Sequence, residues 1–381
     1  MSALTPKEAI GAAIGVYDLE FGRESPENVF SRHPDINNRF DFKGTEAFDS
    51  ETGAFLKFKS GFGVAALSKE NPDTKIKRND ALITIRGTRG LADWLSDANI
   101  GMQLSETSKV VHAGFNRVFN EFSDELRSFF QKHSVDTIHC VGHSLGGALA
   151  TLAADSLSHH GLASNIKLYT FGCPRVGFEP FSRRLTTNIG ANNIYRVYHN
   201  TDPVSMIPQW PFIHAPQPGN TYSIPGSGHN VVSAHFKDNY LKSVKKMNGD
   251  KWGQLPYAHT GEPSADEVIN WLTKSVTTLS SFTLRMIGGA IKLIISVANL
   301  AIVPGMTALD LLSQALSKAA SASKEALGLT KMLMKNILSM LGHSINETAK
   351  FTAQFIRWVF DLLSKAVYKM VSMAINLDFT R

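Results

Sequence analysis

A single five-residue segment, Gly142-His143-Ser144-Leu145-Gly146, constrains this chain more than any other feature of its sequence. It follows an apolar run typical of a buried strand and precedes an alanine-rich pattern typical of a helix, which is the context of a nucleophile elbow. Glycine is needed at both flanks because side chains there would collide with the neighbouring strand and helix around a strained serine. The serine hydroxyl is then held at a helix N-terminus, where backbone N–H groups favour a developing negative charge.

Strands and helices alternate around this segment, and the alternation indicates an α/β fold with a mostly parallel sheet. The sequence ALITIR at 81–86 is a compact apolar run, as expected of a buried strand. Near the start of the chain, Thr5 and Glu8 form a capping box with Pro6 at the first helical position. Strands are expected at 55–59, 64–67, 81–86, 137–141, 167–171 and 193–198, and further helices at 115–132 and 148–158.

A change of composition after Met247 marks a boundary in the chain. Residues 248–263 hold three glycines and two prolines without periodicity, which is typical of a loop or linker. Ser264 and Glu267 then form a second capping box, and the sequence beyond is helical almost throughout. We therefore expect an α/β domain at 1–262 and a helical domain at 263–381.

The excess positive charge lies entirely in this C-terminal region. Residues 275–381 hold 11 Lys and Arg against 5 Asp and Glu, which accounts for the whole net charge of +6. They also hold seven of the eleven methionines. A basic, methionine-rich and apolar region indicates contact with a membrane surface or with partner helices. Nucleic-acid binding would call for a basic face with aromatic stacking, so no nucleic-acid partner is expected.

Composition excludes several other classes of protein. The chain has 381 residues, of which 43% are hydrophobic and 19% charged, so disorder and a coiled-coil rod are both excluded. Cys140 and Cys173 are too few for a disulfide scaffold or a four-cysteine zinc site, and we expect both to be buried and inert. The N-terminal segment lacks a basic stretch followed by a long apolar run, so no secretory signal peptide is expected.

An elbow serine needs an acid and a base, which in this context follow it in the order Ser, Asp, His. Asp202 is the best acid, because it comes just after the strand expected at 193–198, where a loop residue can reach the carboxyl edge of the sheet. Asp155, in the helix after the elbow, is the competing candidate and is interpreted as a solvated helix residue.

Three histidines downstream of Ser144 compete for the role of base. His235 is favoured because it begins a helical pattern, and the base in such enzymes comes from the loop or first turn before a late helix. His229, in a glycine-rich loop, is the alternative base, and His214 lies in a proline-rich loop. His143 belongs to the elbow itself and is expected to pack rather than to carry protons.

Six segments in a fixed order resemble the class 3, or fungal-type, lipases. They are ITIRGTRGLADWLSD, VHAGF, VGHSLGGALATLAA, YTFGCPRVG, YRVYHNTDPVSMIP and a late histidine followed by Tyr240 and Leu241, and together they span 81–244, under half of the chain. One such motif would be weak, whereas six in order are highly specific. The resemblance implies an α/β-hydrolase fold and hydrolysis of a lipid ester.

The resemblance also implies roles for individual residues. Ser144 corresponds to the nucleophile, Asp202 to the orienting acid and His235 to the base. The oxyanion hole corresponds to Thr88 and Leu145, and His214 matches a structural histidine. The lid corresponds to 91–99, and Leu91 and Trp94 on it suit an amphipathic flap that opens onto lipid, although Trp94 could equally pack on the core. Neither a cofactor nor a metal is needed for this chemistry.

The resemblance does not extend to the helical C-terminal region. Residues 286–303 form an apolar stretch of 18 residues, near the lower limit for a transmembrane helix, but Lys292 and Asn299 within it weaken that interpretation. Apolar residues keep helical spacing again around 309–341 and 345–377, the latter with basic Arg357, Lys365 and Lys369 nearby. Two interpretations stay open, a helical domain packed on itself or on the hydrolase, and a membrane-binding module.

We therefore expect a lipid-ester hydrolase of the phospholipase A or triacylglycerol lipase type. A bacterial enzyme made in the cytoplasm and exported by a specialised secretion system as a toxin is one use that fits these features. The alternative is a membrane-inserting or partner-binding protein that uses the hydrolase domain as a scaffold, with a protein partner on the helical tail. The complete set of Ser144, Asp202 and His235 argues against that alternative.

Overall fold

The fold is described from a computed structural model of the chain. The description covers residues 2–19, 25–43, 55–57, 63–69, 79–87, 101–217, 220–226, 232–259, 263–296, 307–346 and 350–379. Of the residues singled out above, Thr88, Leu91, Trp94, His229 and Asn299 lie outside these ranges.

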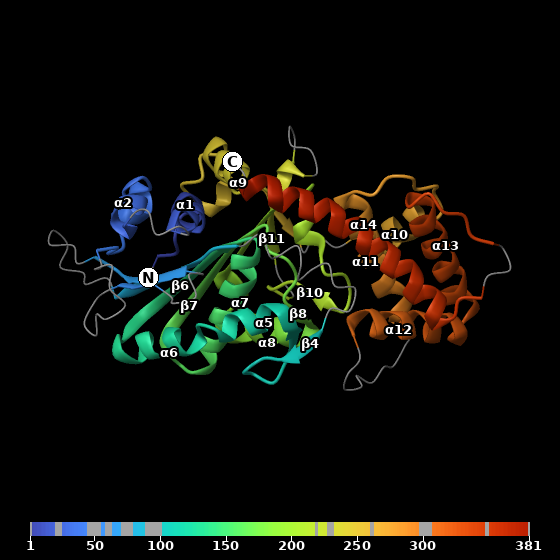
Figure 1. The fold of residues 1–381 in the computed structure, drawn as a ribbon, viewed down its shortest axis with the longest axis horizontal. Coiled ribbons are helices and arrows are strands. Elements are labelled where there is room, and N and C mark those ends of the chain that lie inside the picture. The colour runs from blue at the N-terminus through green and yellow to red at the C-terminus, as the bar shows by residue number, and fades with distance from the viewer. Residues whose placement is uncertain are drawn as a thin grey trace.

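A large mixed sheet runs through the α/β part of the chain (Figure 1). Within the described residues it has eight strands, in the spatial order β1 (Phe55–Lys57), β2 (Gly63–Leu67), β3 (Asp80–Ile85), β6 (Val135–His143), β7 (Ala163–Phe171), β9 (Ile194–His199), β11 (Asn220–Ile224) and β12 (Tyr257–His259). The five central strands from β3 to β11 pair in parallel, and the outer pairs are antiparallel. This arrangement confirms the expected α/β fold with a mostly parallel sheet.

Helices cover both faces of this sheet, as Figure 1 shows. On one face lie α1 (Pro6–Gly15) and α9 (Lys237–Lys246), which also contact each other. On the other face lie α5 (Ala113–Asn120), α7 (Leu145–His159) and α8 (Glu179–Ile189). Because parallel strands are buried on both sides, the sheet edge at the carboxyl ends of the strands is where polar side chains can be exposed for chemistry.

Short elements complete this part of the chain. A small antiparallel sheet, which the sequence analysis did not predict, has the order β10 (Phe212–Ile213), β8 (Gly177–Phe178), β5 (Val110–His112) and β4 (Met102–Leu104). The remaining short helices are η1 (Val16–Leu19), α2 (Pro26–Ser31), α3 (Pro34–Asn37), η2 (Ala191–Asn193), η3 (Val204–Met206), η4 (Ser233–His235) and η5 (Trp252–Gln254). Strands of two or three residues are too short to show a period in the sequence.

The prediction of a single helix at 115–132 is wrong in one respect, because the structure has two helices there. α5 ends at Asn120 and α6 (Ser123–Lys132) begins after Phe122, whose backbone at φ −133° and ψ 1° is not helical. Phe122 is fully buried, and its ring meets that of Phe119 edge to face at 5.5 Å between centroids. The break therefore allows this aromatic side chain to enter the core.

The C-terminal part of the chain is helical, as expected. It comprises α10 (Ala265–Leu272), α11 (Ser281–Ile295), α12 (Ala308–Ala322), α13 (Lys324–Met340) and α14 (Ala353–Phe379). The capping boxes of Thr5 with Glu8 and of Ser264 with Glu267 are both confirmed. α14 begins later than the stretch 345–377 suggested, since Thr352 still lies outside the helix and accepts a bond from the N–H of Phe355.

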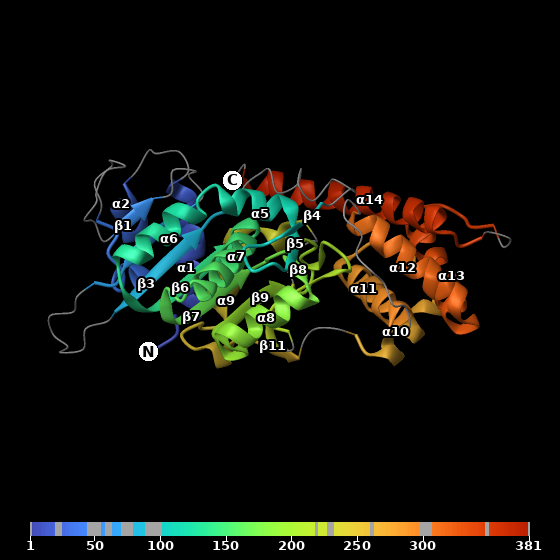
Figure 2. The same cartoon turned by 90° about the horizontal axis from the view of Figure 1, so that it is seen from below.

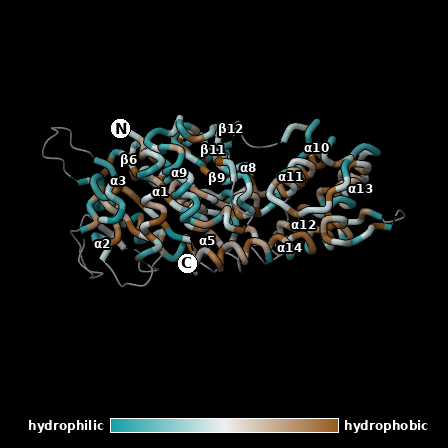
Figure 3. The backbone as a smooth tube through the Cα atoms, turned by 90° about the horizontal axis from the view of Figure 1, so that it is seen from above, coloured by the Kyte–Doolittle hydropathy of each residue, from teal (hydrophilic) through white to brown (hydrophobic). Residues whose placement is uncertain are grey.

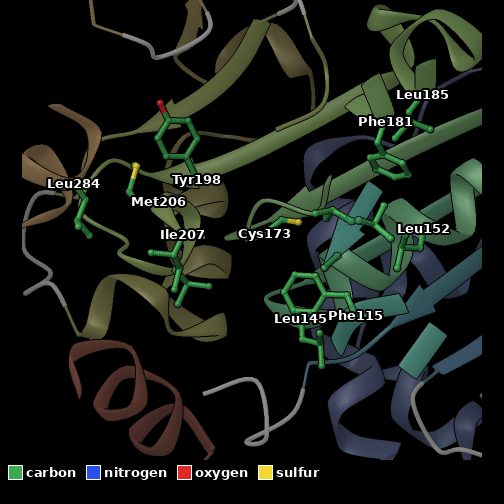
Figure 4. Close-up of a cluster of buried hydrophobic side chains, with 14 of the residues drawn as sticks. Phe115, Leu145, Leu152, Cys173, Phe181, Leu185, Tyr198, Met206, Ile207 and Leu284 are labelled. Carbon is green, nitrogen blue, oxygen red and sulfur yellow. The ribbon is translucent and has the colours of Figure 1, made fainter. Parts of the chain in front are cut away.

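The buried apolar core continues from the α/β part into the helical region. Figure 4 shows Leu284 of α11 beside Met206 and Ile207, in the same cluster that contains Leu145 of α7. Apolar faces of the C-terminal helices are thus packed both on one another and on the α/β part. Among the described helices none is both long and apolar enough to cross a membrane.

Helix α14 reaches back from the helical region across the α/β part towards α9 (Figures 1 and 2). It contacts η4, the short turn that ends at His235. Hydrophobic residues recur along it, as Figure 3 shows by colour. Val367, Val371 and Ile375 are four residues apart and buried in the shared core, so one face of α14 is an integral part of the packing.

Candidate active site

Ser144 sits at a sharp turn between β6 and α7, at φ 58° and ψ −131°. A positive φ at a residue other than glycine is strained, and such strain persists only where the surroundings enforce it. Both neighbouring glycines are needed for close backbone approach. A Cβ on Gly142 would overlap the carbonyl of Gly146, and one on Gly146 would overlap the carbonyl of Ile85. The five-residue segment therefore forms the nucleophile elbow that its sequence indicates.

The structure brings Ser144, His235 and Asp202 together in one hydrogen-bonded row. The Ser144 hydroxyl lies 2.8 Å from His235 Nε2 and can donate its proton there. His235 Nδ1 lies 2.9 Å from Asp202 Oδ2, to which it donates. All three side chains are buried. This is the geometry in which a histidine can remove the serine proton while a carboxylate orients the ring.

Two further donors hold the carboxylate of Asp202 in place. The backbone N–H of Val204 donates to Oδ1 at 2.8 Å, and the Tyr240 hydroxyl donates to Oδ2 at 2.7 Å. Burial, and then the charge of Asp202, raise the pKa of the Tyr240 hydroxyl well above its ordinary value, so this group keeps its proton and remains a donor. In the sequence Tyr240 stood out only as part of the late motif after His235, and its bond to Asp202 comes from the packing of α9.

Replacing Tyr240 with phenylalanine should therefore weaken catalysis without abolishing it. A hydrogen bond to a charged group contributes about 1.5–3 kcal/mol, so we expect kcat/KM for an ester to fall by about 10–100-fold. Tyr195→Phe is the matched control, since Tyr195 stacks on Tyr169 and has no bond to Asp202. Steady-state kinetics of both variants test this role, and equal losses in the two would contradict it.

A second set of contacts fixes the backbone of His235. His143 Nε2 donates to the carbonyl of His235 at 2.9 Å, and the Tyr17 hydroxyl lies 2.9 Å from His143 Nδ1. Burial, and then the proximity of His235, lower the pKa of His143 well below its ordinary value, so its ring is neutral and can accept from Tyr17. His143 thus packs beside the nucleophile as expected. Tyr17 lies far away in the sequence, and no motif pointed to it.

The Tyr17 hydroxyl also accepts a bond from the N–H of Gly87 at 2.9 Å, just before Thr88. A Cβ at Gly87 would lie 3.2 Å from Cβ of Ser144, so the chain passes close to the nucleophile at this point. Leu145 is the first residue of α7, and its N–H is one of those that a helix leaves without an intrahelical partner. Leu145 therefore suits one donor of an oxyanion hole.

The competing candidates have other surroundings. His214 Nε2 donates to the carbonyl of Ser205 at 2.7 Å, in keeping with a structural role. The interpretation of Asp155 as a solvated residue is wrong. It is buried, accepts a bond from Thr107 at 2.8 Å and pairs with Arg184, because α7 is buried in the core from Leu145 to Leu157.

Both cysteines are free and buried, and burial raises the pKa of each thiol. A thiol with a raised pKa is rarely a thiolate at neutral pH and is therefore inert. In the described part of the chain, no group of three or more His, Cys, Asp or Glu side chains is arranged to hold a metal ion.

Comparison with known proteins places this site in context. Residues 82–212 match the model of the class 3 lipase family. A secreted mono- and diacylglycerol lipase of Fusarium solani is 33% identical over 162 residues, which cover 41% of this chain and 46% of that protein. Phospholipase A1-II 4 of Oryza sativa subsp. japonica is 25% identical over 225 residues, covering 50% of this chain and 57% of that protein.

The chain thus spans about half the length of the curated relatives it matches. Among solved structures, the triacylglyceride lipase of Rhizomucor miehei aligns with a TM-score of 0.43 and 21% identity, over 57% of this chain and 78% of that one. The family match ends at residue 212, so α10 to α14 lie beyond it.

Proposed function

We propose that this chain, whose residues 82–212 match the class 3 lipase family, hydrolyses carboxylic esters of lipids. The observation that carries the proposal is the hydrogen-bonded row of Ser144, His235 and Asp202 at a strained elbow. Acylglycerols and the acyl esters of phospholipids are the substrate classes in question, since the relatives include a mono- and diacylglycerol lipase and a phospholipase A1.

The reaction proceeds in two acyl transfers. His235 takes the proton of Ser144 as its oxygen attacks the ester carbonyl, and the negative charge that develops on the carbonyl oxygen meets the N–H of Leu145. His235 then gives the proton to the departing alcohol, which leaves an acyl-serine. Water, deprotonated by the same histidine, releases the fatty acid and restores the serine. Thr88 is proposed as the second donor of the oxyanion hole.

The proposed substrate lies in an aggregate or a bilayer, and the covering of the site fits that. Ser144 is only 4% exposed, and α14 contacts the η4 turn that carries His235. Substrate can reach the serine only after part of this cover moves. A lipid surface can drive such a movement by binding the moving part more tightly in its open position.

The outer face of α14 suits a lipid surface. Trp358, Lys365, Lys369, Met373 and Leu377 are exposed and recur at intervals of seven and four residues along the helix. An amphipathic helix with aromatic and apolar residues beside lysines is typical of interfacial binding, in which the lysines meet anionic head groups. We therefore propose that α14 carries the hydrolase to a membrane surface, in preference to a protein partner.

Product analysis on mixed vesicles tests the proposed activity. The full-length protein is incubated with vesicles that contain both a phospholipid and a triacylglycerol, and the released lipids are separated. We expect free fatty acid together with lysophospholipid, diacylglycerol or both, which identifies the substrate class. Folded protein that releases no fatty acid from either lipid would contradict the proposal. Use as an exported bacterial toxin would further require membrane damage by the wild type and none by Ser144→Ala.

A further inference from the structure

A cavity of about 330 Å³ lies between the hydrolase and the helical region, away from Ser144. Its hydrolase wall comes from β9, β11 and the segment around η3, and its other wall from α10 and α11. This volume falls within the range of about 300–1,000 Å³ typical of small-molecule sites. Figure 4 shows Tyr198 and Met206 of the first wall near Leu284 of α11.

The lining of the cavity is strongly cationic. Arg175 and Arg196 come from the hydrolase, and Arg285 and Lys292 come from α11. Among the described residues that line the cavity, none is Asp or Glu. Four like charges around so small a volume repel one another, so the arrangement favours an anion between them.

Arg196 is the most buried of the four cations in this lining. It is 5% exposed, its guanidinium lies 4.3 Å from the centre of the Tyr198 ring, and its Nε has no hydrogen-bond partner. In the described part of the chain it forms no ion pair with a carboxylate. A buried charged donor without a partner is costly, and such groups are normally satisfied by a counter-charge or a ligand.

Other buried polar atoms without hydrogen-bond partners belong to residues that line the same cavity. Arg285 Nε and Thr221 Oγ1 are buried without hydrogen-bond partners, and both residues line the cavity. Arg175 is tied at one nitrogen to the carbonyls of Met206 and Pro208, which sets its position in the wall. The unsatisfied groups therefore come from both walls, β11 and β9 on one side and α11 on the other.

The pKa of His214 reflects the same excess of positive charge. This ring lies in the cavity wall, and its pKa is well below the ordinary value because of burial and then because of Arg196, Arg175 and Lys292. The ring is therefore neutral, and its Nε2 donates to the carbonyl of Ser205.

We propose that this cavity binds the phosphate group of a phosphate-bearing ligand, either the head group of an anionic phospholipid or a soluble phosphate ester. Guanidinium groups match phosphate oxygens in pairs, and a phosphate monoester brings about −1.5 to −2 charges where a carboxylate brings one. The apolar part of the lining, which includes Trp210 and Leu293, leaves room for the glycerol or ring that carries the phosphate. This binding is independent of ester hydrolysis.

Such a ligand would hold α11 against the hydrolase next to the acid of the active site. Ser281, the first residue of α11, donates to the carbonyl of Thr201 at 2.6 Å, directly before Asp202. Arg285 and Lys292 lie one and three turns further along the same helix. A phosphate bridging them to Arg196 would therefore tie the two parts of the chain together and raise their stability.

The soluble source is tested by thermal unfolding of the full-length wild-type protein. We expect inorganic phosphate or inositol trisphosphate to raise Tm saturably, by about 2–4 °C near saturation, relative to sodium chloride at equal ionic strength. The lipid source is tested with full-length Ser144→Ala protein, which leaves vesicles intact, on phosphatidylcholine vesicles with and without phosphatidic acid. If only the vesicle assay responds, with tighter binding to the vesicles that contain phosphatidic acid, the ligand is the lipid head group.

A charge-matched pair of variants separates this site from general charge attraction. Arg285→Gln with Lys292→Gln removes two cations from the cavity, and Lys331→Gln with Lys335→Gln removes two exposed cations from α13. We expect the first pair to weaken apparent affinity by ~10-fold or more in whichever assay responds, and the second to change it little.

Equal weakening by both pairs, or no response of the wild type in either assay, would overturn the proposal. If the double variant Arg285→Gln, Lys292→Gln no longer unfolds cooperatively, the single variant Lys292→Gln replaces it in the binding assay. It should then weaken binding more than Lys331→Gln does, and an equal effect of the two would overturn the proposal.

Discussion

Ser144→Ala should lower kcat for a lipid ester by about 10⁴–10⁶-fold, since the nucleophile, base and acid act as one unit. The alanine side chain fits the elbow, so the loss comes from the missing oxygen, which lies 2.8 Å from His235 Nε2. His235→Ala should cost a similar factor, because the serine proton then has no acceptor. Fatty-acid release from vesicles and hydrolysis of a short-chain ester measure both variants.

His229→Ala is the matched control for the base, as the other histidine that the sequence left open. We expect it to keep most of the wild-type rate, whereas His235→Ala loses it. Circular dichroism and Tm should show that each variant is folded. Ester hydrolysis that persists in Ser144→Ala would contradict the proposed activity. Loss of turnover in His229→Ala but not in His235→Ala would assign the base to His229.

Undocking α14 should raise hydrolysis of a soluble short-chain ester by about tenfold or more. Val371→Asp with Ile375→Asp places two carboxylates on the face of α14 that is buried in the core shared with Leu145. A buried, unpaired carboxylate is costly, and each increment of about 1.4 kcal/mol against the docked state shifts its equilibrium about tenfold. A soluble ester can then reach Ser144 without a lipid surface to undock α14.

Met373→Asp with Leu377→Asp is the control on the same helix, because these side chains are 45% and 49% exposed. This pair should leave soluble-ester hydrolysis near the wild-type rate and instead weaken binding to vesicles. Unchanged soluble-ester activity in a folded Val371→Asp, Ile375→Asp protein would show that α14 does not limit access. Point changes are preferable to ending the chain near Lys274, since that would expose the apolar surface that Leu284 covers.

Local chemistry made much of the site predictable. The strand, the glycines and the helix around Ser144 all act within a few residues, so the elbow could be inferred from spacing alone. The same holds for the two capping boxes, whose bonds run between residues three apart. His235 could be favoured over His214 because its place before a helix is also a local property.

Contacts between distant segments were beyond such reasoning. Tyr17 meets His143 across 126 positions, and Tyr240 meets Asp202 across 38, with no pattern in the sequence to link them. Asp155 was misjudged for the same reason, since its ion pair is with Arg184 of another helix. The break at Phe122 likewise follows from the space available in the core rather than from propensity.

By itself the sequence determined the α/β fold, the elbow serine and the location of the excess charge in the C-terminal region. Only the tertiary structure decided what these parts do to one another. It packed α11 and α14 onto the hydrolase, buried Ser144, and set Arg285 and Lys292 opposite Arg175 and Arg196 around one cavity. Net charge is a sum along the chain, whereas the field in a cavity depends on which residues face it. Part of a chain that is neutral on balance can therefore still supply half of a cationic site.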